Sequence, residues 1–282
     1  MNHPTSPHRN IWSTRACWRT DREGGAVPTV EFHRSGHVAE IRLNRPASLN
    51  AIDDEMDRAL ADAWERVDGD PDIRVAVLSG TGDRAFCAGA DMANPPLGHD
   101  GLSFGGGLSG IGGRLNPLRK PLICAVQGYV LGLGFELAMC ADIIIAAEDA
   151  VFRLPEARAG IIDHCGVVHR AIRQLPHHVA MAMIIASEPL TAQDALRFGL
   201  INACVDRSAL PAETSRWIAR LLECSPLVSQ AGKEAALDGL RHSLPDALSA
   251  SYPQIKSYQA TQDRAEAAVA WKERRAPQWL GR

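Results

Sequence analysis

Two glutamates in the middle of the chain have the surroundings that acid–base chemistry needs. Glu136 follows Gly132 to Phe135 and opens an apolar run, Leu137 to Cys140, so it is expected at the N-terminus of a helix that enters the core. Glu156 ends a second apolar run, where Pro155 directs the chain out of a strand. Two carboxyl groups held close together in a dry site acquire different pKa values, so that one accepts a proton while the other donates one. This pattern indicates general acid–base catalysis.

A plainer interpretation of the same two residues stays open. Glu136 would then be a helix-terminal charge that the helix dipole stabilises. Glu156 would be an exposed loop residue. Spacing alone does not decide between the two interpretations.

Strands and helices alternate in the first part of the chain. The pattern predicts a hairpin over residues 30–43. A helix follows from the cap residue Asp53 to a stop that begins at Gly69, and then a buried strand over Val75 to Leu78. We interpret Ala85 to Met92 as a loop in which a glycine permits close approach of another backbone.

The second part predicts a helix over Glu136 to Cys140 between buried strands at Leu122 to Val126 and Ile143 to Ala147. Beyond Cys165 helical patterns dominate, and only Ile201 to Val205 is typical of a strand. The chain is therefore predicted to form an α/β fold with a helical C-terminal region. It contains no linker long enough to separate independent domains.

Composition excludes several classes of protein. An apolar fraction of 46% in 282 residues is ample for a core, and no apolar run of about twenty residues could span a membrane. A net charge of −3 gives no electrostatic case for nucleic-acid binding. The seven cysteines lack paired spacing, and His164, Cys165 and His169 match no zinc pattern. We expect a cytoplasmic protein without a metal, preceded by a disordered or loosely docked extension over residues 1–27.

Three segments together resemble the crotonase family, the enoyl-CoA hydratases and isomerases: Ala85 to Met92, Gly128 to Glu156 and Pro189 to Asn202. The likeness runs from about Thr29 to the C-terminus in the family's order. It implies a crotonase-like spiral of ββα units.

The resemblance also implies how the chain is divided and what it binds. Residues 28–205 would form the catalytic core, and residues 206–282 a helical region for trimerisation and CoA contacts. The implied assembly is a homotrimer or a dimer of trimers. The implied substrate is an acyl-CoA thioester, with no cofactor beyond the CoA of the substrate itself.

Site roles follow from the resemblance by position. Glu136 would activate water at Cβ of a 2-enoyl-CoA, and Glu156 would exchange a proton at Cα. The peptide N–H groups of Ala88 and Leu133 would hold the thioester oxygen as an enolate. Most relatives have glycine where this chain has Leu133, although a backbone donor survives a change of side chain.

The resemblance also implies residues that contact the substrate or CoA, although the sequence motifs around them match the family less well than those around the glutamates. Between Pro46 and Asn50 the chain has Ala47, Ser48 and Leu49, and so lacks the basic residue that is usual in the family. His164 stands where relatives have a glycine beside the water. The residues expected to contact substrate or CoA are Ala90, Asp91, Met92, His164, Lys233, Trp271 and Arg274.

The function predicted from the sequence is that of an enoyl-CoA hydratase. Two other crotonase-type activities stay open, an enoyl-CoA isomerase that uses one glutamate and a dehydratase of a branched or carnitine-like acyl-CoA. A non-catalytic CoA-binding subunit is the third alternative. The pair of glutamates argues against that third alternative, because binding alone needs neither.

Overall fold

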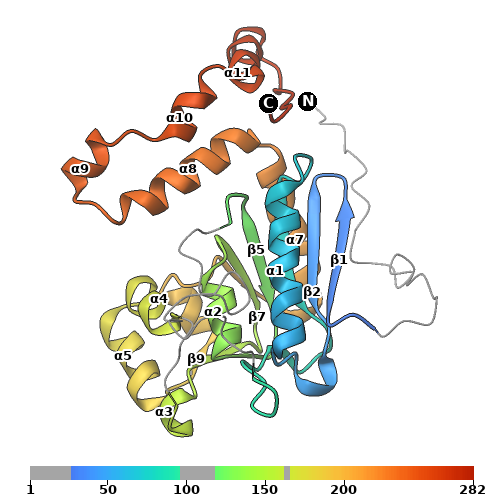
Figure 1. Cartoon of the computed structure of the whole chain (residues 1–282), viewed down its shortest axis with the longest axis vertical. Helices are drawn as coiled ribbons and strands as arrows, with labels where there is room; N and C mark the ends of the chain where they lie inside the picture. The colour runs from blue at the N-terminus through green and yellow to red at the C-terminus, as the bar shows by residue number, and fades with distance from the viewer. Residues whose placement is uncertain (1–26, 96–117, 162–165) are drawn as a thin grey trace.

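The computed structural model describes residues 27–95, 118–161 and 166–282. The strands in these ranges form two sheets (Figure 1). His164, Cys165 and residues 1–26 of the predicted N-terminal extension lie outside the described residues. Within the described ranges, no helix is long and apolar enough to cross a membrane.

The larger sheet has six strands in the order β1-β2-β3-β5-β7-β10. Its first two strands form the predicted antiparallel hairpin, in which Ser35 pairs with Val38. The other neighbours run parallel. The strands are β1 (Val30–Ser35), β2 (Val38–Leu43), β3 (Val75–Gly80), β5 (Leu122–Val126), β7 (Ile143–Ala147) and β10 (Ala203–Val205).

Three strands of the smaller sheet each come directly after a strand of the larger sheet: β4 follows β3, β6 follows β5 and β8 follows β7. Its order is β4-β6-β8-β9, with β4, β6 and β8 parallel and β9 antiparallel to β8. These strands are β4 (Ala85–Cys87), β6 (Tyr129–Leu131), β8 (Val151–Arg153) and β9 (Leu190–Thr191). Since α2 (Leu133–Met139) follows β6 and α3 (Glu156–Ala159) follows β8, the predicted strand-strand-helix repeat is present.

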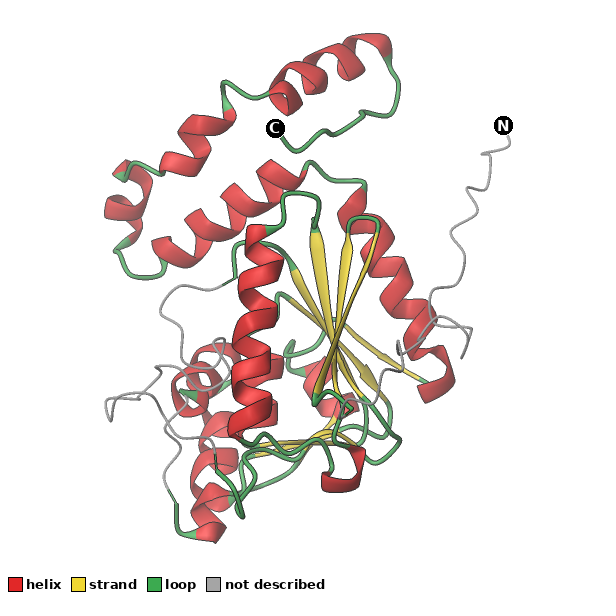
Figure 2. Cartoon of the chain, turned by 45° about the vertical axis from the view of Figure 1, so that its right-hand side comes forward, coloured by secondary structure: helices red, strands yellow, loops and turns green. Residues whose placement is uncertain are grey.

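Helices cover both faces of the larger sheet (Figure 2). On one face lies α1 (Asp54–Gly69), which begins as predicted, because the Asp53 side chain accepts from the Met56 N–H. On the other lies α7 (Leu210–Leu222), whose Ile218 packs in a cluster with Val75 and Val77. The alternate residues of β3 belong to the main core, as the two-residue period of a strand requires.

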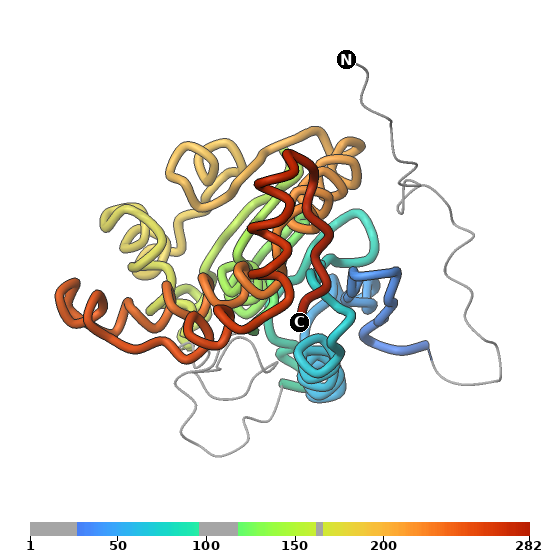
Figure 3. The backbone as a smooth tube through the Cα atoms, turned by 90° about the horizontal axis from the view of Figure 1, so that it is seen from above, coloured from blue at the N-terminus to red at the C-terminus, as the bar shows by residue number. Residues whose placement is uncertain are grey.

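The remaining helices lie beyond the sheets. Two of them, α4 (Val167–Gln174) and α5 (His177–Ala186), lie between β8 and β9 in the chain, and α6 (Ala192–Arg197) follows β9. Four more form an arm at one end of the molecule (Figure 1): α8 (Pro226–Gly239), α9 (Leu244–Ser249), α10 (Pro253–Tyr258) and α11 (Gln262–Glu273). The chain end returns over the start of the arm (Figure 3), where Asp263 accepts from Leu280 N, Gly281 N and Ser225 Oγ.

Three local predictions were wrong. The first residues of the predicted loop Ala85 to Met92 form β4, and β6 and β9 were not predicted at all. With two or three residues each, these strands are too short to show an alternating pattern. The helix predicted from Glu136 begins at Leu133, so Glu136 lies one turn inside α2.

Candidate active site

Glu136 is a fully buried carboxylate in α2. Every residue of this helix is buried, and the Glu136 side chain is 0% exposed. Its Oε1 forms an ion pair with Nη1 of Arg170 on α4, and Cys140 Sγ lies 3.9 Å from the same oxygen. A buried carboxylate needs such a partner, because desolvation penalises the charged form.

Glu156 lies against Gly132, the residue that precedes α2. It is the first residue of α3, directly after Pro155. A Cβ atom on Gly132 would lie 2.6 Å from Glu156 Oε1, so the carboxylate packs against the backbone of Gly132. The Glu136 N–H donates to Gly132 O at 3.0 Å. Both glutamates therefore flank the first turn of α2, which favours acid–base chemistry over the plainer interpretation.

The predicted donor Ala88 needs a correction. Its N–H donates to Leu49 O at 3.0 Å, so this group already has a backbone acceptor. Ala90 occupies a different position in the same extended segment. Ile52 N donates to Gly89 O and Asp91 N to Ile52 O, each at 2.8 Å, and successive N–H groups of an extended chain point to opposite sides. The Ala90 N–H therefore points away from Ile52.

The N–H groups of Ala90 and Leu133 are instead the candidates for the pair of donors. Leu133 is the first residue of α2, and the first N–H groups of a helix have no partner inside it. Among the described residues, neither of these two N–H groups donates to a backbone acceptor in a turn, loop or cap. A Cβ on Gly89 would lie 3.1 Å from Leu131 O and 3.6 Å from Leu133 N, so the two segments run close together.

The close approach of α2 to β4 holds these segments in place. A Cβ on Gly134 would lie 2.5 Å from Cys87 O and 2.6 Å from Cys87 Cβ, a distance that no real side chain tolerates. Burial raises the pKa of the Cys87 thiol to about 12. Cys87 is therefore a packing residue and not a nucleophile.

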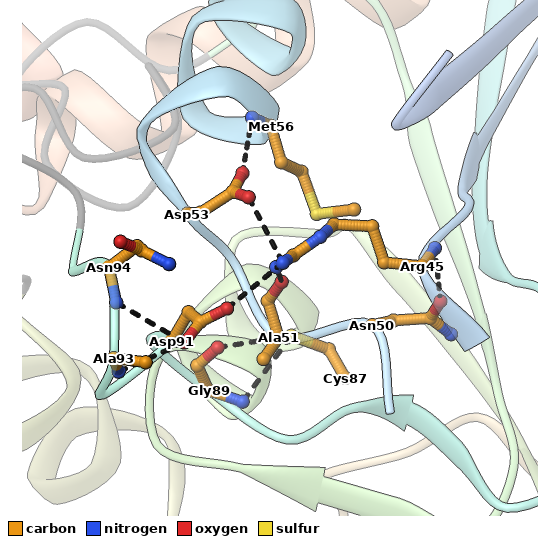
Figure 4. A network of polar contacts seen from close by, with 10 residues as sticks. All are labelled: Arg45, Asn50, Ala51, Asp53, Met56, Cys87, Gly89, Asp91, Ala93 and Asn94. Atoms are coloured by element: carbon orange, nitrogen blue, oxygen red, sulfur yellow. Dashed lines mark hydrogen bonds and ion pairs between the residues drawn. The ribbon is translucent and has the colours of Figure 1, made fainter. Parts of the chain in front are cut away.

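An arginine fixes the loop that carries Ala90 (Figure 4). Nη2 of Arg45 lies 3.1 Å from Asp53 and 3.0 Å from Asp91, while Nη1 donates to Ala51 O at 2.5 Å. Asp91 also accepts from the N–H groups of Ala93 and Asn94. The hydrogen bond from Arg45, followed by that from Ala93, holds the pKa of Asp91 below its ordinary value. The network connects the cap of α1 to the loop.

Asn50 joins the same loops from inside the core. Its side chain is 0% exposed, and Oδ1 accepts from Arg45 N at 2.9 Å. Nδ2 donates to Thr81 O at 2.9 Å and to Ala85 O and Phe86 O at 3.1 Å. These bonds fix the path of β4, which leads directly to Ala90.

Comparison with known proteins decides the family. The family model described as enoyl-CoA hydratase/isomerase matches residues 33–282. The chain belongs to this family.

Individual family members are similar along almost their whole length. The (E)-benzylidenesuccinyl-CoA hydratase of Thauera aromatica is 36% identical over 255 residues, which cover 89% of this chain and 99% of that protein. The carnitinyl-CoA dehydratase of Salmonella typhi is 36% identical over 264 residues, covering 90% and 99%.

Solved structures of the family have the same fold. A short-chain enoyl-CoA hydratase candidate from Novosphingobium aromaticivorans is 49% identical with a TM-score of 0.84, covering 90% of this chain and 100% of that one. An enoyl-CoA hydratase from Mycobacterium tuberculosis is 31% identical with a TM-score of 0.82, covering 91% and 100%. The predicted crotonase fold is thus confirmed.

The other predicted binding residues lie in three different places. Met92 is 71% exposed next to the loop of Ala90. Lys233 Nζ lies 2.6 Å from Asp142 and donates to Lys120 O at 3.0 Å. Trp271 is 88% exposed and, with Arg274, lies at the end of α11, which is at the other end of the molecule from α2 (Figure 1). Their contacts with substrate or CoA stay predictions.

Arg45, Asn50 and Arg170 are the site residues that the sequence did not predict. Arg170 is 34 positions from Glu136, and no local spacing connects the two. The one usable signal is that Arg170 and Gln174 are four residues apart, as neighbours on one helix face are. For Asn50, nothing in the sequence distinguishes a buried amide from a turn residue.

Gly132 offers a test of the position of Glu156. Gly132→Ala should lower turnover of a CoA-thioester substrate strongly, because the new Cβ would displace the Glu156 carboxylate. The backbone strain of about 1–3 kcal/mol, from φ 47° and ψ −119°, adds a loss of stability. Steady-state kinetics and thermal unfolding measure both effects.

Gly199→Ala is the matched control. Gly199 also has a positive φ, 77°, but a Cβ there would meet no atom within 4 Å. This variant should lose stability and keep its turnover number. Equal losses of turnover in both variants would contradict the placement of Glu156.

Proposed function

We propose that this protein is an enoyl-CoA hydratase that adds water reversibly to a 2-enoyl-CoA thioester. The observation that carries the proposal is the convergence of two glutamates and two backbone donors on the first turn of α2. The named relatives support the same reaction type, since one is a hydratase and the other a dehydratase of CoA thioesters.

The proposed reaction uses each group once. The N–H groups of Ala90 and Leu133 hold the thioester oxygen and stabilise the negative charge that develops on it. The Glu136 carboxylate takes a proton from water while the water oxygen bonds to Cβ. The electrons of the double bond move toward the thioester, and Glu156 delivers a proton to Cα. Transfer of the proton from Glu136 to Glu156 restores the starting state.

The likeness to the two named relatives supports a second candidate, a dehydratase or hydratase of a substituted acyl-CoA. This chain has Leu133 at the position where the resemblance implies glycine in most relatives, and the Leu133 side chain is buried. Comparing crotonyl-CoA with branched and aromatic 2-enoyl-CoA esters would separate the two candidates. A preference for the plain chain supports the first candidate.

Replacing either glutamate should abolish most of the activity. Glu136→Gln and Glu156→Gln should each lower kcat by about 10²–10⁴-fold, as expected for loss of general acid–base catalysis. The double variant should lose little more than the worse single variant, because the two residues act as a unit. The loss of enoyl thioester absorbance with crotonyl-CoA measures the rates.

A matched control and a binding measurement complete this test. Glu148→Gln changes an exposed glutamate and should keep full activity. Calorimetry with butyryl-CoA should show nearly unchanged affinity in both active-site variants. Small additive losses of kcat, or a large loss of binding, would contradict the assignment.

We also propose that the chain assembles as a homotrimer or a dimer of trimers. The helical arm exposes large apolar side chains, with Leu240 80%, Leu244 72% and Leu248 78% exposed. Exposed apolar surface of this extent is typical of an interface. A reducing, cytoplasmic location and the absence of a further cofactor stay predictions.

Light scattering tests the assembly. The native protein at micromolar concentration should have three or six times the mass of one chain, and Leu244→Asp with Leu248→Asp should reduce that mass. Leu196→Asp, on α6 and 43% exposed, is the control that should leave it unchanged. A native monomer would contradict the proposal.

A further inference from the structure

Two polar side chains of α4 contact α2, the helix that carries Glu136. Arg170 and Gln174 are four residues apart on α4, and both reach α2. Arg170 pairs with Glu136, and Gln174 Nε2 donates to Met139 O at 3.0 Å. Arg173 instead donates to His169 O on an exposed part of α4. One face of α4 therefore holds α2 through two contacts, one at Glu136 and one at Met139.

The burial of Glu136 makes its charge depend on this contact. Its neighbours Phe135, Leu137 and Ala138 are apolar and 0% exposed. A carboxyl group in such surroundings favours the neutral acid, whereas a guanidinium in contact favours the carboxylate. Arginine stays protonated throughout the working pH range. With 27% of its side chain exposed, Arg170 also keeps part of its hydration.

We propose that Arg170 is a positioning residue that holds Glu136 as an oriented carboxylate, ready to act as the base. The inference rests on the proposed hydratase function, because only a base must be charged before the reaction begins. An arginine partner weakens a base, but a neutral carboxylic acid could not accept the proton at all. The ion pair also fixes Oε1, which orients the carboxylate.

Within the described residues 27–95, 118–161 and 166–282, the other ionisable groups near α2 do not replace Arg170. Cys140 lies on the same helix, and burial, then the Glu136 charge, raise the pKa of its thiol well above the ordinary value. Cys87 on β4 is likewise a neutral thiol. Glu156 on α3, whether neutral or ionised, carries no positive charge that could stabilise the Glu136 carboxylate. Lys233 is paired with Asp142.

The test replaces the guanidinium and then returns it. Arg170→Ala should lower kcat on crotonyl-CoA by about 10²-fold with little change in KM, as expected when a general base is lost. The acidic limb of its kcat profile should move to higher pH, because the carboxylate form of Glu136 is no longer favoured. Millimolar guanidinium chloride should restore part of the activity. Urea, which has the same shape without the charge, should not.

Two further variants keep the test decisive. Arg170→Lys should retain more activity than Arg170→Ala, and Arg173→Ala, on the same helix, should behave as wild type. If Arg170→Ala does not fold, Arg170→Gln replaces it in the same measurements. Unchanged kcat and pH profile, or equal rescue by urea and guanidinium, would overturn the proposal.

An infrared measurement separates this proposal from the proposed function. The difference spectrum between wild type and Glu136→Gln should contain a carboxylate band near neutral pH. The same difference in an Arg170→Gln background should contain a carboxylic acid band instead. A carboxylate band in both backgrounds would overturn the role of Arg170, whereas an inactive wild type would count against the hydratase function alone.

Discussion

Backbone contact between the end of β4 and the first turns of α2 is the constraint on which the site depends. Gly134 lies so close to Cys87 that any side chain at position 134 would overlap it. This contact brings the segment that precedes Ala90 alongside Leu133, the arrangement that the proposed pair of backbone donors requires. The glycines at positions 89, 132 and 134 therefore serve close approach, which only glycine permits.

Polar side chains of the neighbouring loops support that contact. Asn50 bonds to four backbone groups, and Arg45 joins the cap of α1 to Asp91. Buried polar groups are costly unless they are satisfied, so such networks specify one arrangement of the loops. The two glutamates have different surroundings. Glu136 is enclosed and paired with Arg170, while Glu156 stands at the start of a short helix with part of its surface open.

Sequence patterns predicted the parts of the molecule that depend on local rules. The hairpin at Ser35, the cap at Asp53 and the fold class followed from alternation, capping and resemblance, and the structure and the comparisons confirm them. The donor at Ala88 was wrong because the direction of a backbone N–H depends on a partner, Leu49, that lies 39 positions away. Arg170 was missed because its pairing is a tertiary contact. Local signals carry no information on either feature.

The polarisation of the thioester carbonyl tests the central claim most directly. Crotonyl-CoA labelled with ¹³C at the carbonyl can be bound to the Glu136→Gln, Glu156→Gln double variant, in which turnover is blocked but both backbone donors remain. Infrared spectroscopy of this complex should show the carbonyl stretch at lower frequency than in free crotonyl-CoA, because two N–H groups donate to the oxygen. An unshifted carbonyl band in a saturated complex would contradict the account.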